Sequence, residues 1–309
     1  MNKQLLFFIL IMALNCHWIN AQQKPVVSQY MFNGLVLNPA YAGTNGYFSA
    51  TGMLRNQWVN LDGAPRVSTL AIHSNVKNKN IGLGMVVTND KIGVHDDLGA
   101  YFSYAYHLKL PVGKLSMGLQ AGFNNLTSNF NELNLSTASD PILNDQITRF
   151  KINFGTGIYY FTENFYAGLS IPYIIKNRNF KQLDVIRNIE ESRYYYFTIG
   201  KVLELSENLK IKPSGLLRIE EGMPVAYDIS ANLFIDDAIN VGVSYREGDS
   251  VIGMFEIQLS DFLRFGYAYD YVISELSNYA QGTHEVMVNY RLNLFAPKHH
   301  RMCPGPAYF

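Results

Sequence analysis

Leu115-Ser-Met-Gly-Leu-Gln-Ala-Gly-Phe-Asn124 alternates strictly between apolar and small or polar side chains. The odd positions carry Leu, Met, Leu, Ala and Phe, and the even positions carry Ser, Gly, Gln, Gly and Asn. Successive side chains of a β-strand point to opposite faces of the sheet, so this period of two predicts a strand with one apolar face. The same alternation recurs in Leu263–Tyr271 and in Glu285–Leu294.

This pattern predicts an all-β chain of about fourteen antiparallel strands. Most are about ten residues or longer, above the mean of about 5–6 in soluble sheets and near the roughly 9–11 that cross a bilayer at a tilt. An even number is typical of a transmembrane outer-membrane β-barrel. The expected strands are 46–57, 66–76, 79–89, 96–109, 112–126, 149–161, 163–174, 191–204, 208–219, 224–236, 238–247, 250–259, 261–271 and 283–294.

The predicted connections alternate between short and mostly longer ones. The short ones are Lys77-Asn78, Leu110-Pro111, Thr162, 205–207, Asp236-Asp237 and Ser260. The others are 59–65, 90–95, 127–148, 175–190, 220–223, Gly248-Asp249 and 272–282. Outer-membrane barrels have tight periplasmic turns and larger outside loops, and an even strand number places both termini in the periplasm. We expect the loops 127–148 and 175–190 to face an exported protein.

Composition agrees with a membrane barrel and argues against nucleic-acid binding. The chain has 309 residues and no net formal charge, and only 16% of its residues are charged while 14% are aromatic. An average soluble protein has about 25% charged residues. The sequence has no run of basic residues that could bind the phosphate backbone of a nucleic acid, so nucleic acid is not an expected partner.

The chain divides into four expected parts. Residues 1–21 have the charged start, apolar stretch and small exit residue of a signal peptide, with cleavage expected near Ala21. A segment 22–45, periplasmic or a plug, precedes the barrel at 46–295 and a periplasmic tail at 296–309. No later run is apolar enough for a membrane helix, so only a closed barrel satisfies the backbone in lipid. Cys303 is the one cysteine left in the mature chain, which excludes an internal disulfide.

The segment 29–43 is richer in aromatic and apolar residues than a lead-in to a sheet requires. Asn38-Pro39 favours extended or turn geometry, and Gly43 supplies turn chemistry. A free periplasmic tail would leave the large side chains of this segment in water, so they must be buried in the lumen or against a partner. The sequence leaves both options open. These side chains are Tyr30, Phe32, Leu35, Leu37 and Tyr41.

No catalytic motif or metal spacing is found, so neither an enzyme nor a cofactor is expected. Ser103 and His107 share a strand face at about 13 Å, too far apart to hydrogen-bond. A set of charged residues falls on the lumen-facing parity and predicts a network of charge pairs or contacts to a plug, with a pore lining as the alternative. This set is Arg55, Asp228, Glu256, Arg264, Asp270, Glu285 and Arg291.

Trp58 is the one tryptophan outside the signal peptide. It follows a predicted strand and precedes Asp62-Gly63, a pair typical of a turn. It is either an anchor in the aromatic belt of the membrane or packed under this turn.

Together these stretches resemble the PorP/SprF family of outer-membrane proteins associated with type IX secretion and gliding motility. The matching pieces are Gln29–Gly43, Arg55–Trp58, Asp62–Pro65 and His73, and they accompany a strand pattern over the whole mature chain. The C-terminal Cys303-Pro304 is also similar, although Gly305-Pro306 interrupts the expected ending.

The resemblance implies a non-enzymatic outer-membrane protein that supports secretion or surface attachment of an exported adhesin. Its partners would be type IX secretion components in the periplasm and outer membrane, the C-terminal domain of that adhesin, and outer-membrane lipid. An outer-membrane channel or hydrophobic-solute transporter is the alternative. The residues expected to bind a partner or to form a plug are Tyr30, Phe32, Asn33, Asn38, Pro39, Tyr41, Gly43, Arg55, Trp58, Asp62, Gly63 and Pro65.

Overall fold

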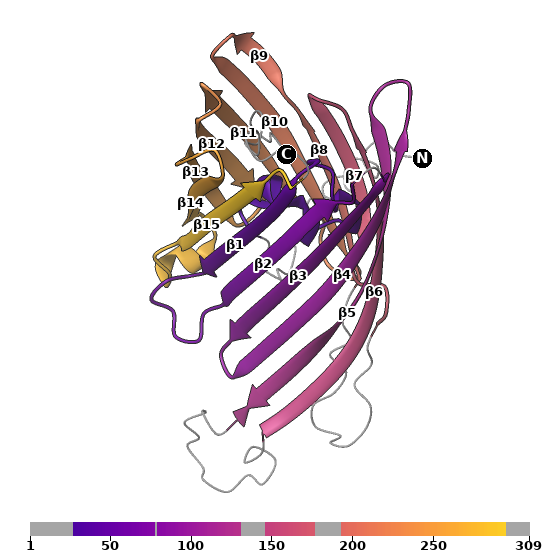
Figure 1. Cartoon of the computed structure of the whole chain (residues 1–309). Helices are drawn as coiled ribbons and strands as arrows, with labels where there is room; N and C mark the ends of the chain where they lie inside the picture. The colour runs from indigo at the N-terminus through magenta and orange to yellow at the C-terminus, as the bar shows by residue number, and fades with distance from the viewer. Residues whose placement is uncertain (1–26, 78, 131–145, 177–192, 295–309) are drawn as a thin grey trace, which may run out of the picture.

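The computed structural model describes residues 27–77, 79–130, 146–176 and 193–294, whose strands form one closed barrel around a short N-terminal segment (Figure 1). The strands are β1 (Phe48–Asn56), β2 (Arg66–Asn75), β3 (Ile81–Ile92), β4 (His95–Lys109), β5 (Lys114–Asn129), β6 (Gln146–Phe161), β7 (Phe165–Ile171), β8 (Tyr194–Lys201), β9 (Leu203–Ser206), β10 (Leu209–Glu220), β11 (Ala226–Ile235), β12 (Ile239–Arg246), β13 (Ser250–Gln258), β14 (Leu263–Val272) and β15 (Thr283–Leu292).

The described strands confirm the predicted number of fourteen. Neighbours along the chain pair antiparallel, and the sheet closes where β1 pairs with β15 and β10 with β11. The segments β8 and β9 both pair with β10 and are separated only by Val202, so they form one barrel strand. Closure removes the sheet edges, which a lipid environment cannot hydrogen-bond.

The two ends of the barrel differ in their connections. One end, which we call the short-turn rim, carries the connections β2–β3, β4–β5, β6–β7, β9–β10, β11–β12 and β13–β14, together with the start of β1 and the end of β15. The opposite end, the long-loop rim, carries the rest. The prediction of a longer connection at 90–95 is wrong. The β3–β4 ladder continues to the pair Ile92↔His95, so the turn consists only of Gly93-Val94. The predicted loops 127–148 and 175–190 lie mainly outside the described residues.

The barrel is apolar outside and polar inside. In β11 every second residue is buried, and the outward Ile229 is 60% exposed while the inward Asp228 is 4% exposed. Leu119 on β5 is likewise 63% exposed, whereas the charged Arg55 and Glu285 are enclosed. This inversion of the soluble pattern is that of a membrane barrel, whose outer band contacts hydrocarbon. Within the described ranges, no helix has the length and hydropathy of a membrane span.

Candidate functional site: the plug and its seat in the lumen

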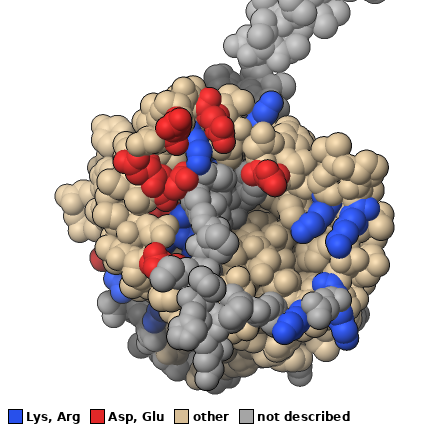
Figure 2. Space-filling view, turned by 45° about the horizontal axis from the view of Figure 1, so that its top comes forward, with Lys and Arg blue, Asp and Glu red and all other residues tan. Residues whose placement is uncertain are grey.

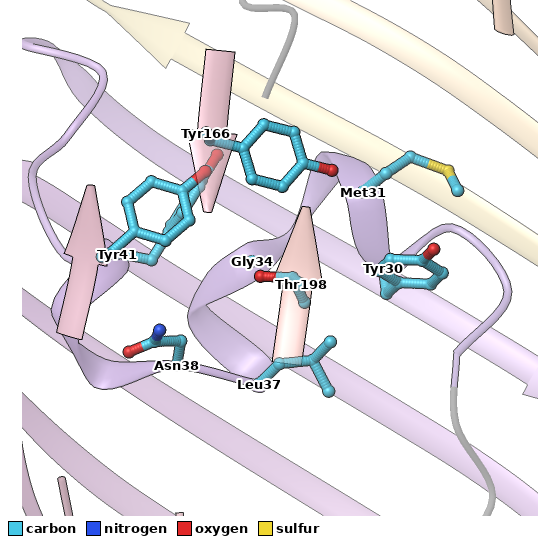
Figure 3. A pocket seen from close by; sticks show the side chains of 9 residues that line it. Tyr30, Met31, Gly34, Leu37, Asn38, Tyr41, Tyr166 and Thr198 are labelled. Atoms are coloured by element: carbon cyan, nitrogen blue, oxygen red, sulfur yellow. The ribbon is translucent and has the colours of Figure 1, made fainter. Parts of the chain in front are cut away.

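Residues 27–47, which we call the plug, lie inside the barrel (Figures 1 and 3). The plug consists mainly of three short 3-10 turns, η1 (Tyr30–Phe32), η2 (Gly34–Val36) and η3 (Pro39–Tyr41). Its buried apolar side chains are Val27, Tyr30, Met31, Leu35, Leu37, Ala40, Tyr41, Ala42 and Tyr47. Of the two burials that the sequence leaves open, the geometry of this chain shows the lumen.

Asn38-Pro39 sets the local conformation of the plug. Asn38 is extended, with φ −141° and ψ 115°, and its Oδ1 accepts a hydrogen bond of 2.9 Å from Ala40 N. This is an N-cap, and proline follows at the first position of η3, where its missing N–H costs nothing. The pair therefore turns the chain sharply inside the barrel.

The barrel wall satisfies polar groups of this part of the plug. Ser116 Oγ donates to Ala40 O at 2.6 Å, and Ser170 Oγ donates to Leu37 O at 2.7 Å. Asn38 Nδ2 donates to Ile158 O at 2.9 Å. Irregular backbone at this depth needs such partners because a buried unpaired carbonyl is costly.

Lumen-facing glycines allow the plug to approach the wall closely. A Cβ built on Gly118 would come closer than 3.0 Å to the backbone of Pro39 and Ala40, and one on Gly157 closer than 3.0 Å to Asn38 Oδ1. The two glycines are paired across β5 and β6. They form a flat seat for η3 that side chains would fill.

Aromatic rings fill most of the remaining space. Tyr41 makes edge contacts with Tyr159 at 5.6 Å and with His73 at 5.4 Å between ring centroids. His73 Nδ1 in turn accepts a hydrogen bond of 3.2 Å from Gly43 N. Beside Tyr41 and Tyr159 a cavity of about 20 Å³ remains, which is also lined by Tyr30 (Figure 3). This is room for about one water molecule, so this cavity is no binding site for a solute.

The start of the plug is held by what we call the charge clasp, which comprises Ser28, Gln29, Arg55, Asp270 and Glu285. Arg55 pairs with Asp270 at 2.7 Å and with Glu285 at 3.2 Å, all at most 2% exposed. Glu285 accepts from Ser28 N at 2.7 Å and Gln29 N at 2.9 Å, and Ser28 Oγ donates to Asp270 at 2.8 Å. The clasp therefore joins β1, β14 and β15 to the plug near the long-loop rim.

The clasp continues around the lumen. Arg246 donates to Asp228 at 2.9–3.0 Å and lies 3.7 Å from Asp270. Charge-assisted bonds in an enclosed site are stronger than neutral ones, and a buried pair is tolerated only when its remaining atoms are also bonded. The predicted lumen residues Asp228, Asp270 and Glu285 thus belong to one network.

The other predicted lumen residues lie toward the short-turn rim. Arg264 pairs with Glu256 at 2.8 Å, and Arg291 donates to the hydroxyl of Tyr47 at 3.3 Å. On the same half of the lumen, Lys212 lies 4.7 Å from the ring centroid of Phe32 in a cation–π contact.

The structure divides the predicted partner-binding or plug residues into two groups. Tyr30, Phe32, Asn33, Asn38, Pro39, Tyr41 and Gly43 belong to the plug, and Arg55 holds it. Asn33 is buried, and its Nδ2 donates to Met53 Sδ at 3.3 Å. Trp58, Asp62, Gly63 and Pro65 lie instead in the β1–β2 connection at the long-loop rim.

That connection is a structured loop apart from the plug. Trp58 is half-buried with φ 50°, and its backbone N–H donates to Thr283 Oγ1 at 3.2 Å. Asp62 is exposed, and Gly63 has φ 73° and accepts from Gly93 N at 2.9 Å. Pro65 O accepts from Gln57 N at 2.9 Å.

Several residues of the seat were not identified from the sequence. Arg246 occupies a lumen-facing position in the alternation of its strand, so the criterion that identified Asp228 also applies to Arg246. Ser116, Gly118 and Gly157 also fall on lumen parity, and small residues facing each other across two strands signal close packing of another segment. Within the part of the chain that the structure describes, no three His, Cys, Asp or Glu residues are grouped to hold a metal ion.

Residues 19–290 match the family described as type IX secretion system membrane protein PorP/SprF. The chain belongs to this family. The family resemblance drawn from the N-terminal motifs is therefore confirmed, and so is the expectation of a non-enzymatic protein, because this family is one of secretion-system membrane barrels.

Solved barrels are similar to the chain only at low identity. The outer membrane protein Omp33 of Acinetobacter baumannii has 10% identity and a TM-score of 0.48, covering 79% of this chain and 97% of its own. The CymD monoaromatic hydrocarbon channel has 13% identity and a TM-score of 0.46, covering 88% and 94%. No curated protein matches the chain significantly. Family membership and the closed, outwardly apolar barrel together make this chain an integral outer-membrane β-barrel.

Proposed function

We propose that this chain is a plugged outer-membrane component of the type IX secretion system that supports secretion or surface attachment of an exported adhesin. The observation that carries the proposal is the filled lumen. Residues 27–47 occupy it, with the clasp near one end and the glycine seat further along. A barrel whose interior is packed with its own chain is suited to binding and holding other proteins, whereas passive diffusion needs open space.

We further propose that the short-turn rim faces the periplasm, since tight turns are typical of the periplasmic end of such barrels. Secretion components would then meet this rim, and Figure 2 shows acidic and basic side chains gathered on different parts of that face. Exposed basic residues at this rim include Lys77, Lys79, Lys109, Lys114 and Lys201, and exposed acidic ones include Glu163, Glu204, Glu207, Asp236 and Asp261. Such separated charges would orient a partner with the complementary arrangement.

The C-terminal domain of the adhesin would bind on the opposite side, at the loops 127–148 and 175–190. Rigid scaffolds commonly carry recognition on long loops. The signal peptide at 1–21, cleaved near Ala21, would deliver the mature chain to this compartment.

The test is deletion of residues 29–43 in the producing bacterium. We expect the barrel to remain in the outer membrane, measured by its heat-modifiable migration on a gel, while the adhesin is lost from the cell surface. The control is Gly253→Ala, since a Cβ at that outward glycine meets nothing within 4 Å. Normal adhesin display by the deletion variant would contradict the proposed role.

Conductance separates this function from a channel. The full chain in a planar bilayer is expected to show no steady conductance, and the variant lacking 29–43 is expected to conduct. Steady conductance or uptake of a hydrophobic solute by the full chain without partners would favour the channel instead.

A further inference from the structure

A row of polar and aromatic side chains, which includes two cations, crosses the outer face of the barrel near the long-loop rim. Strand register places its members directly opposite one another on neighbouring strands, of which β1, β2 and β3 lie side by side in Figure 1. We call these residues the outer row. They are Tyr269 on β14, His284 on β15, Asn56 on β1, Arg66 on β2, Lys91 on β3 and Asp96 on β4.

The outer row lies on the surface that meets the membrane, at the end of its apolar band. Leu54 is two residues from Asn56 on β1 and is 59% exposed, and Leu70 is four residues from Arg66 on β2 and is 42% exposed. Because side chains alternate along a strand, Asn56 and Arg66 share the outward face with these leucines. Arg66 and Lys91 are themselves exposed. The row therefore marks the level where hydrocarbon gives way to head groups.

Arg66 and Lys91 are like charges in one cross-strand pair. Directly opposite residues of antiparallel strands have Cα atoms about 4.5–5.5 Å apart, and like charges in such a pair are destabilising. Within the described ranges, neither side chain makes an ion pair or a hydrogen bond. An anion bound between the two side chains would remove their repulsion.

The neighbours in the outer row do not supply this anion. Asp96 lies opposite Lys91 on β4, but it accepts a hydrogen bond of 2.5 Å from Asn89 Nδ2 and makes no ion pair with Lys91. On the other side of the row, His284 Nδ1 is hydrogen-bonded to the hydroxyl of Tyr267 at 2.7 Å. The two cations thus face solvent and lipid without a counter-ion from the row.

The apolar surface next to the cations contains a gap at Gly52. This glycine on β1 lies directly between Val288 on β15 and Leu70 on β2, which are 43% and 42% exposed. A Cβ built on Gly52 would meet no atom within 4 Å. Leu70 lies about 13 Å along β2 from Arg66, so a hydrocarbon chain whose head group reaches the cations can lie in this gap.

We propose that Arg66 and Lys91 bind the phosphate monoester of a glycolipid in the outer leaflet, with one of its hydrocarbon chains over Gly52. A phosphate monoester carries a charge of about −1.5 to −2 near neutral pH, which matches two cations, whereas the diester of a phospholipid carries a single charge. The planar donors of Arg66 fit two phosphate oxygens, while Lys91 adds a point charge. Asn56 beside Arg66 is placed to bond a sugar hydroxyl.

The geometry of the site does not depend on the secretion role. From the proposed function it takes only the orientation, in which the long-loop rim lies on the outer side of the membrane. Basic residues close to a membrane surface are a general means of recognising anionic head groups. The apolar gap beside the pair adds a preference for an anion that carries hydrocarbon.

The test is native mass spectrometry of the mature full chain in detergent micelles, titrated with phosphorylated lipid A and with the same lipid after removal of its phosphates. We expect the phosphorylated form to bind about tenfold more tightly or better, the size of one charge-assisted contact. Replacing Arg66 and Lys91 together by Gln should remove this preference. The control is Lys201→Gln, which changes an exposed lysine near the short-turn rim and should keep it.

Two further variants test the geometry of the site. Asp96→Asn removes the carboxylate beside Lys91, so phosphorylated lipid A should bind several fold more tightly, whereas a variant that only damaged the fold would bind more weakly. Gly52→Leu fills the gap and should weaken binding of both forms of lipid A. Gly253→Leu is its control, because a Cβ at that outward glycine also meets nothing within 4 Å.

Phosphatidylglycerol separates the glycolipid from other anionic lipids. Its diester should bind more weakly than phosphorylated lipid A, and equal or tighter binding would overturn the choice of a phosphate monoester. Equal affinity for the two forms of lipid A, or a preference that persists when both cations are replaced, would overturn the site itself. The secretion role is judged by adhesin display, so it can fail without the lipid site and the lipid site without it.

Discussion

Gly118→Ala tests whether the plug packs directly against the barrel wall at this glycine. The added Cβ would come closer than 3.0 Å to backbone atoms of Pro39 and Ala40, and backbone cannot rotate away as a side chain tip can. Relief requires the plug to move by about 1 Å, which stretches hydrogen bonds of 2.6–2.9 Å beyond the normal range.

The size of the effect follows from the three wall bonds of this part of the plug. Each contributes about 1 kcal/mol, so losing them destabilises the seated plug by about 3 kcal/mol, similar to the upper cost of overpacking a core. The population of unseated plug then rises about 100-fold. The outer surface of the barrel is unaffected because Gly118 faces the lumen.

The assay is the rate of maleimide labelling of Leu37→Cys in a Cys303→Ser background. Leu37 is 5% exposed, so labelling reports departure of the plug from the wall. Gly253→Ala is the matched control, since its Cβ meets no atom within 4 Å. An unchanged rate in Gly118→Ala, with the barrel folded, would refute the close seating of the plug.

Three further perturbations probe other contacts. Arg55→Gln leaves Asp270 and Glu285 buried without their main cation, so it should lower the free energy of unfolding in urea by about 3–5 kcal/mol. The control is Arg66→Gln, which changes an exposed arginine on the same hairpin and should alter this free energy little. Asn38→Ala removes the cap and the bond to the wall, which should destabilise the seated plug by about 1–2 kcal/mol. The labelling rate of Leu37→Cys should therefore rise about tenfold, and a rate equal to that of the parent would contradict the capping role. The hydrogen bond from Lys176 lowers the pKa of Glu221, so this contact stabilises above the ordinary pKa of 4.5 and is lost as pH falls through the lower folded value. Hydrogen exchange of 221–225, corrected for intrinsic rates, should therefore accelerate in acid, and Glu221→Gln should abolish that acceleration.

Most of the barrel was predictable from the sequence because its two faces meet different solvents. Period-two alternation appears wherever one side of a strand faces lipid and the other a polar lumen, as in β5 and β11. The turn between β3 and β4 was less predictable. Asp90 and Lys91 are polar like loop residues and Gly93 is typical of a turn, but Asp90, Lys91 and Ile92 continue the ladder with β4, so polar side chains did not mark the end of the strand there.

The seat of the plug was predictable only in part. Parity identified which charged residues face inward, but pairing among them depends on strand register, which single-strand patterns do not contain. Asp270 and Arg55, for example, lie on β14 and β1, which do not pair with each other but both pair with β15. Burial of residues 29–43 followed from their apolar content, whereas the choice of lumen over partner depended on small residues such as Gly118 and Gly157 across the barrel.

The anchoring of the plug at its two ends constrains how the lumen can open. At the short-turn rim the plug continues covalently into β1 at Phe48, so that end cannot leave. At the other end, among the residues that the structure describes, the clasp holds Ser28 and Gln29 through buried charge-assisted bonds that are stronger than the neutral bonds at Ala40 and Leu37. Loosening the middle alone therefore leaves the plug fixed at both ends and the lumen filled. An agent that clears the lumen must act on Arg55 and its carboxylates, near the long-loop rim, which is where the proposed orientation places the exported protein.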